Sequence, residues 1–158
     1  MLEDYEQMVS QEIIDGLTLA RDVIQTSDSS IVVIKNSNVL FKKKGVGIKP
    51  ILQAIEELGE EIHGSIIGDR IIGKASAFLC RYANVKAVYS PQATKTAIAI
   101  LIIGGIPCQA DTMIQYIKNR DGDDYCPFEK ILEGVTEPKN AFFILKNNYL
   151  RSKKRFNI

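Results

Sequence analysis

Tryptophan is absent from this chain of 158 residues, histidine occurs once and cysteine occurs three times. With His63 as the single histidine, the sequence excludes a two-histidine zinc site and the helical motif of zinc proteases. Three widely spaced cysteines make a poor disulfide framework. We therefore expect reduced thiols and a cytoplasmic protein.

The sequence also lacks a dominant charge and a long apolar run. Lysine and arginine total 20 against 19 aspartates and glutamates, so the formal net charge is +1. This balance argues against a dedicated nucleic-acid-binding protein. The longest apolar run, residues 97–106, has about half the length that a bilayer requires, and the acidic start at Leu2–Glu6 differs from a secretory signal. We expect neither a membrane nor a nucleic-acid partner.

The apolar patterns predict one α/β domain of 29–158 behind a helical extension of 1–28. Apolar residues make up 46% of the chain, enough for one core. A β-hairpin is followed by alternating helices and strands, which predicts a mixed sheet with helices on both faces. The helix over 93–103 is apolar nearly all round and is expected to be buried. The expected helices are 3–26, 50–58, 69–83, 93–103 and two that start at 127 and 138; the expected strands are 31–34, 39–41, 62–67, 85–89 and 108–117.

The first candidate site is the predicted helix start at residues 68–75. Asp69 is a good helix N-cap, because its carboxylate accepts from backbone N–H groups at the positive end of the helix dipole. Arg70 and Lys74 are four residues apart, so both cations would lie on one helix face. Gly73 costs a helix about 1 kcal/mol relative to alanine, which suggests close approach by another backbone or a ligand. The alternative is that Asp69 only caps and Lys74 is solvated.

The second candidate site is the predicted helix start after an acidic loop. Pro127 fits the first helical position, which makes Cys126 the cap and Glu129 the third helical residue. Glu129 could then reach back to the backbone of Cys126, as in a capping box. A cysteine at a helix start favours the thiolate, which is both a nucleophile and a metal ligand. The alternative is a small buried cap.

Three motifs occur in order along the chain: Gly47-Ile48-Lys49-Pro50, residues 69–75, and Asn119-Arg120 followed by Cys126-Pro127-Phe128-Glu129. Together they resemble an uncharacterised prokaryotic domain family that is grouped with the cytidine-deaminase-like fold. The resemblance extends over about residues 30–144. It implies a three-layer α/β/α sandwich in which the two helix starts lie beside each other at one pocket.

The resemblance also shows where this chain departs from active deaminases. Those enzymes carry His-x-Glu or Cys-x-Glu at the first helix start and Pro-Cys-x-x-Cys at the second. Here Asp69 replaces the first ligand and Ile71 replaces the catalytic glutamate, while Cys126 matches one ligand and Glu129 replaces the other. The usual ligand set is therefore incomplete. The cofactor stays open, although an Asp, Cys and Glu set can hold zinc.

Three functions follow as hypotheses, and the sequence leaves open whether the protein is an enzyme. The first is binding of a small anionic molecule, such as a nucleotide, between the two helix N-termini. The side chains expected to hold it are Arg70, Lys74, Asn119 and Arg120. The second is a divergent metal- or cysteine-dependent hydrolase or deaminase. The side chains expected to act there are Asp69, Cys126 and Glu129. The third is a structural module that forms a homo-oligomer.

Overall fold

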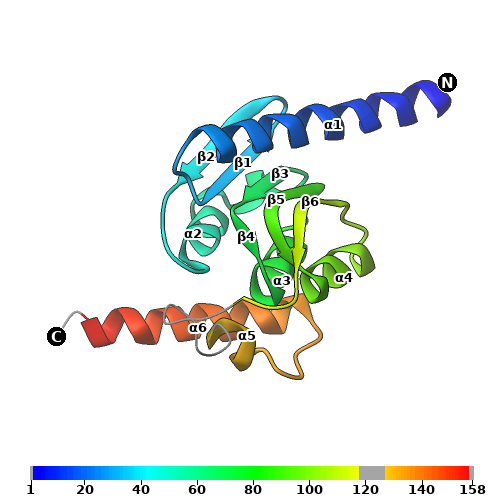
Figure 1. The fold of residues 1–158 in the computed structure, drawn as a ribbon. Coiled ribbons are helices and arrows are strands. Elements are labelled where there is room, and N and C mark those ends of the chain that lie inside the picture. The colour runs from blue at the N-terminus through cyan, green and yellow to red at the C-terminus, as the bar shows by residue number, and fades with distance from the viewer. Residues whose placement is uncertain (1, 118–126, 157–158) are drawn as a thin grey trace.

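The computed structural model describes residues 2–117 and 127–156, with side chains over 10–117 and 127–151. Its elements form one α/β sandwich (Figure 1). The helices are α1 (Leu2–Thr26), α2 (Lys49–Leu58), the 3₁₀ helix η1 (Gly59–Ile62), α3 (Lys74–Tyr82), α4 (Lys95–Ile103), α5 (Pro127–Ile131) and α6 (Pro138–Phe156). The strands are β1 (Ile31–Lys35), β2 (Asn38–Lys43), β3 (Ile66–Asp69), β4 (Ile71–Ile72), β5 (Ala87–Thr94) and β6 (Cys108–Ile114).

The strands form one mixed sheet, as the alternation of elements predicts. β1 pairs antiparallel with both β2 and β3, whereas β5 pairs in parallel with β3, β4 and β6. β6 pairs with β5 along the stretch of β5 from Val88 to Thr94. A strand has two edges, so β3 and β4 share the other edge of β5, one after the other along it.

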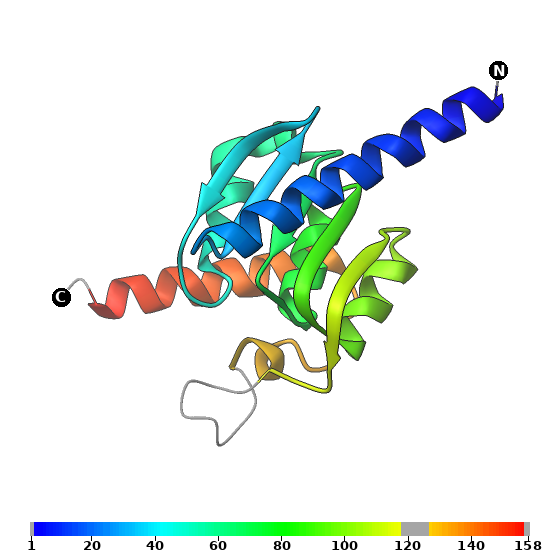
Figure 2. The ribbon, with the colours of Figure 1, turned by 45° about the horizontal axis from the view of Figure 1, so that its top comes forward.

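Helices cover both faces of this sheet, which confirms the predicted sandwich. α1 lies across one face, and α2, α3 and α4 lie on the other (Figures 1 and 2). β1 supplies both cores because successive side chains of a strand point to opposite faces. Val32 and Ile34 join the cluster beneath α1, whereas Ile31 and Val33 join the larger cluster around α2 and α3. α6 packs on α3 from outside.

The helix expected from Asp69 begins five residues later, at Lys74, so this prediction was wrong. Asp69 ends β3, and Ile71–Ile72 form a short strand that pairs with Gln92 and Ala93 of β5. Gly73 then precedes the helix with an extended backbone. Pairing with β5 therefore extends the chain where a helix was expected. Asp69 does not cap α3, and Arg70 does not share a helix face with Lys74.

Two other expectations also need correction. The strand expected over 62–67 lies at Ile66–Asp69, because Gly59–Ile62 form a 3₁₀ helix. The helix expected to be buried all round is α4, whose exposed fractions reach 62% at Ile102 and 77% at Ile103. α4 packs on α3, β5 and the edge strand β6, which leaves its outer side uncovered by the described residues. Within those residues, no helix combines the length and hydropathy that crossing a bilayer requires.

Candidate functional site

The start of α3 binds the carboxylate of Glu129, which is 55 residues away in the sequence. The backbone N–H of Lys74 donates a hydrogen bond to Oε1 of Glu129, at 2.7 Å. Gly73 makes room for this contact, because a Cβ there would overlap Glu129 Oε1 and lie 2.6 Å from Cδ1 of Ile117. The close approach expected at Gly73 is thus made by a side chain of α5. Glu129 caps a helix other than its own.

α5 also touches the loop that leads into α2. Gly47 has a φ of +64°, which L side chains rarely adopt, and a Cβ there would lie 2.9 Å from Cε2 of Phe128. α5 therefore contacts both the loop before α2 and the start of α3. Parts of all three motifs meet at this place, which we call the α3-start site: Gly47, Gly73, Lys74, Phe128 and Glu129.

Asp69 lies beside the first turn of α3 although it does not cap the helix. Burial of its carboxyl group raises the pKa to about 7, from an ordinary value of 3.8. Hydrogen bonds from the backbone N–H groups of Ile71 and Arg70 and from Ser76 oppose this rise. The residue as a whole is half-buried. A carboxyl group with such a pKa can take up or release a proton near neutral pH.

Burial raises the pKa of Glu129 as well. The hydrogen bond from the backbone of Lys74 and the charge of the Lys74 side chain act in the opposite direction. Both residues are half-buried. Two carboxyl groups with raised pKa values therefore contact the first turn of α3: Glu129 through Lys74, and Asp69 through Ser76.

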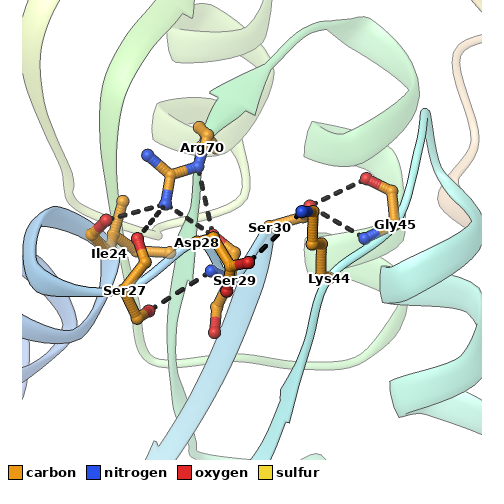
Figure 3. Close-up of polar contacts among 8 residues, drawn as sticks. All are labelled: Ile24, Ser27, Asp28, Ser29, Ser30, Lys44, Gly45 and Arg70. Atoms are coloured by element: carbon orange, nitrogen blue, oxygen red, sulfur yellow. Dashed lines mark hydrogen bonds and ion pairs between the residues drawn. The ribbon is translucent and has the colours of Figure 1, made fainter.

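Arg70 points toward the end of α1 rather than toward Lys74 (Figure 3). Its Nη2 donates to the carbonyl oxygens of Ile24, Ser27 and Ser29 at 2.7, 3.0 and 2.7 Å. Its Nε donates to the same Ser29 oxygen at 3.1 Å. These donors fasten the loop between α1 and β1 to the sheet.

The remaining predicted site residues, Asn119, Arg120 and Cys126, lie outside the described residues. Of the predicted zinc ligands, the described residues contain Asp69 and Glu129. Within residues 2–117 and 127–156, no three His, Cys, Asp or Glu side chains are placed to hold a metal ion. The zinc set is therefore incomplete there.

Sequence reasoning missed Ser76, the third residue of α3. Its side chain bonds to Asp69, seven residues earlier. The misplaced helix start hid this contact, because residues 69 and 76 are two turns apart in a continuous helix. The two motifs that contain Gly47 and Phe128 are visible in the sequence, but no sequence signal indicates that these residues touch.

Comparison with known proteins gives a family and a shared fold. Residues 19–149 match the family described as "TM1506: Domain of unknown function (DUF1893)". The crystal structure of the DUF1893 family protein TM1506 from Thermotoga maritima is similar, with a TM-score of 0.78 and 22% identity. The match covers 85% of this chain and 90% of that one, and it shows a common fold. No curated protein matches the sequence.

Two further structures are more distant. Acinetobacter baumannii RibD, form 1, has a TM-score of 0.41 and 16% identity, over 66% of this chain and 35% of RibD. The dCMP deaminase of the cyanophage S-TIM5 has a TM-score of 0.43 and 15% identity, over 66% of this chain and 97% of that enzyme.

Proposed function

Since this chain belongs to the DUF1893 family of TM1506, described as a domain of unknown function, we propose that its α3-start site binds a small anionic molecule such as a nucleotide. One observation carries the proposal: the backbone N–H of Lys74 already holds a carboxylate, that of Glu129. A helix N-terminus attracts anions through its free N–H groups and its dipole. A phosphate or carboxylate of the ligand takes the place of Glu129 on Lys74.

Three polar side chains are proposed to contact the ligand: Lys74, Asn119 and Arg120. Lys74 carries a positive charge at the first residue of α3. Ile117 lies against Gly73, and Asn119 and Arg120 follow it within three residues. Asn119 and Arg120 lie outside the described residues, and we propose them as further ligand contacts from their place in the sequence alone. Arginine would add bidentate contacts to a phosphate group.

Glu129 would then act as an internal competitor of the ligand. Its desolvated carboxyl group is held by a hydrogen bond from Lys74. Removing the charge of Glu129 removes its repulsion of an external anion and weakens its hydrogen bond with the N–H group, whereas removing the charge of Lys74 weakens the attraction. The two substitutions should therefore change ligand affinity in opposite directions.

Calorimetric titration with adenosine and cytidine monophosphates tests this function. We expect saturable binding that Lys74→Gln weakens and Glu129→Gln strengthens. Lys95→Gln is the matched control, because Lys95 is the exposed first residue of α4. There the N-cap Thr94 accepts from the N–H of Ala97 at 3.0 Å. Absence of binding by both nucleotides, or equal losses in Lys74→Gln and Lys95→Gln, would refute the proposal.

A second candidate is hydrolysis or deamination with Asp69 and Glu129 as proton donor and acceptor. The raised pKa values of both groups favour it, since efficient acid–base catalysis needs a pKa near the working pH. Cys126 precedes α5 in the sequence and would supply a nucleophile or a zinc ligand. Ammonia release from cytidine and dCMP, with and without added Zn²⁺, provides the test. Turnover that Asp69→Asn abolishes would support this candidate, and absence of turnover would remove deamination.

A further inference from the structure

A cavity of about 350 Å³ lies at the other end of α3. One turn of an α-helix rises 5.4 Å, so the seven steps from Lys74 to Arg81 separate the two ends by about 10 Å. The cavity is lined by Arg81, Asn84, Val85, Gly104, Ile106 and Pro138. These residues come from the ends of α3 and α4, the segments that follow them, and the start of α6. We refer to this place as the Arg81 cavity.

The side chain of Arg81 packs against Gly104, the C-cap residue of α4, which has no side chain to block it. A Cβ on Gly104 would lie 2.6 Å from Nε and 2.8 Å from Cδ of Arg81. The φ of Gly104 is −81°, an ordinary value for any residue. Glycine at this position leaves room for the Arg81 side chain, and the backbone conformation does not require it.

The guanidinium group has no protein partner in the part of the chain that the structure describes. Arg81 makes no hydrogen bond or ion pair there, although its side chain is half-buried. Of the described residues that line the cavity, Arg81 alone carries a charge. A partly buried cation without a counter-charge favours an anion in the adjoining space.

Arginine at a helix end often binds the last carbonyl groups, but here these groups are already bonded. In α3, the oxygens of Leu79, Cys80 and Arg81 accept from the N–H groups of Ala83, Val85 and Asn84. In α4, the oxygens of Ile100, Leu101 and Ile102 accept from the N–H groups of Gly104, Ile106 and Gly105. Capping of these helices therefore does not account for the position of Arg81.

The walls of the cavity are held in place by packing. The rings of Tyr82 and Phe142 stack at 4.0 Å between centroids and 6° between planes, which joins the end of α3 to the first turns of α6. Pro138, the first residue of α6, also lines the cavity, so the positive end of that helix dipole borders it. Asn84 adds an amide in a left-handed turn. Val85 and Ile106 add apolar surface.

We propose that the Arg81 cavity is a second binding site, which takes a small metabolite through an oxyanion, either a phosphate ester or a carboxylate. Arg81 binds the oxyanion, Asn84 adds a hydrogen bond, and Val85 with Ile106 contacts the carbon skeleton. The volume lies at the lower end of the range for small-molecule sites. This site is separate from the α3-start site and does not depend on its function.

NMR titration of the full chain with inorganic phosphate and with succinate, at constant ionic strength, tests this site. The reporters are the Nε–H resonance of Arg81 and the side-chain amide of Asn84. We expect saturable shifts of both with at least one of the two anions. Saturation by phosphate alone identifies a phosphate ester as the ligand class, and saturation by succinate alone identifies a carboxylate.

Three variants separate a built site from general attraction by charge. Arg81→Gln removes the cation, and Gly104→Ala keeps it but pushes the guanidinium aside. Both should weaken binding about tenfold or more, because hydrogen bonds to charged groups contribute at least that much. Arg151→Gln removes an exposed arginine of α6 and should leave the affinity unchanged. Gly104→Ala also covers the case in which Arg81→Gln does not fold.

Linear shifts without saturation for both anions would overturn the proposal. So would equal affinities in Gly104→Ala, Arg151→Gln and the unaltered chain, once circular dichroism shows that the variants are folded. In Lys74→Gln, the anion-induced shifts at Arg81 and Asn84 should be the same as in the unaltered chain. This variant therefore shows whether binding at the Arg81 cavity depends on the α3-start site.

Discussion

Glu129 and Lys74 are 55 residues apart in sequence, yet the carboxylate of one caps the helix that begins with the other. The contact joins α5 to the core, because α3 is buried between the sheet, α4 and α6. Gly73 allows it by having no side chain. The contact therefore places Glu129 of α5 at the start of α3. The shared pocket that the resemblance implies stays a prediction.

Gly73→Ala should destabilise the fold by about 1–3 kcal/mol, since the new methyl group overlaps the carboxylate of Glu129. Urea unfolding measures the effect. In a Glu129→Ala background the same substitution should cost clearly less, which a double-mutant cycle reveals. Equal costs in both backgrounds would show that Glu129 is not what occupies the space.

Arg70→Gln should destabilise the protein by about 1–3 kcal/mol, because three carbonyl oxygens lose a charged donor. Arg70→Lys should restore only part of this loss, since an ammonium group lacks the planar fork of arginine. Arg151→Gln is the control for loss of an exposed positive charge. Urea unfolding of the three variants compares them; no difference between Arg70→Gln and Arg151→Gln would contradict the role described for Arg70.

Asp69 should make the folded state less stable as the pH rises through 7. Its pKa is raised in the folded protein to about 7, so between this value and the ordinary 3.8 the folded state binds the proton more tightly than the unfolded state. The stabilisation is complete below about pH 4 and is lost as the pH passes 7. Unfolding free energies at pH 5 and pH 8 should differ more for the unaltered chain than for Asp69→Asn.

A carboxyl titration followed by ¹³C NMR provides the direct measurement for Asp69. Ser76→Ala should raise the pKa further, because the Ser76 hydroxyl group favours the charged carboxylate. A midpoint near 4 in the folded chain would be incompatible with the burial described here.

Tyr89→Phe should cost about 1 kcal/mol, the typical contribution of one hydrogen bond. The ring is fully buried, and its hydroxyl group donates to Oδ2 of Asp111 on β6 while Gln25 Nε2 lies 3.4 Å away. Burial and the bond to Asp111 raise the pKa of Tyr89, so the hydroxyl group stays protonated at neutral pH. A double-mutant cycle with Asp111→Ala should give a favourable coupling energy; a value of zero would exclude this bond in solution.

Local sequence signals predicted the elements whose shape depends on neighbours in the chain. The hairpin of β1 and β2 turns at Asn36 and Ser37, both with positive φ, which asparagine tolerates well. Pro50 marks the first turn of α2, where its missing N–H leaves no bond unmade. Both predictions are confirmed.

The sequence did not predict features that depend on contacts between residues far apart in the chain. Ile71 and Ile72 fit a helical stripe as well as a strand, and pairing with β5 decides between them. Glu129 was expected to cap its own helix, and no local pattern indicates a partner 55 residues away. The roles of the site residues, zinc binding, the homo-oligomer and the cytoplasmic location stay predictions.

The junction of β3 and β4, at Asp69 and Arg70, links the two faces of the sheet. Neighbouring residues on an extended chain point to opposite faces. Asp69 contacts Ser76 in α3, whereas Arg70 donates to the carbonyl groups at the end of α1. A single peptide linkage thus couples the two outer layers of the sandwich through its middle. We therefore expect a displacement of the first turn of α3 to be transmitted to the C-terminal end of α1.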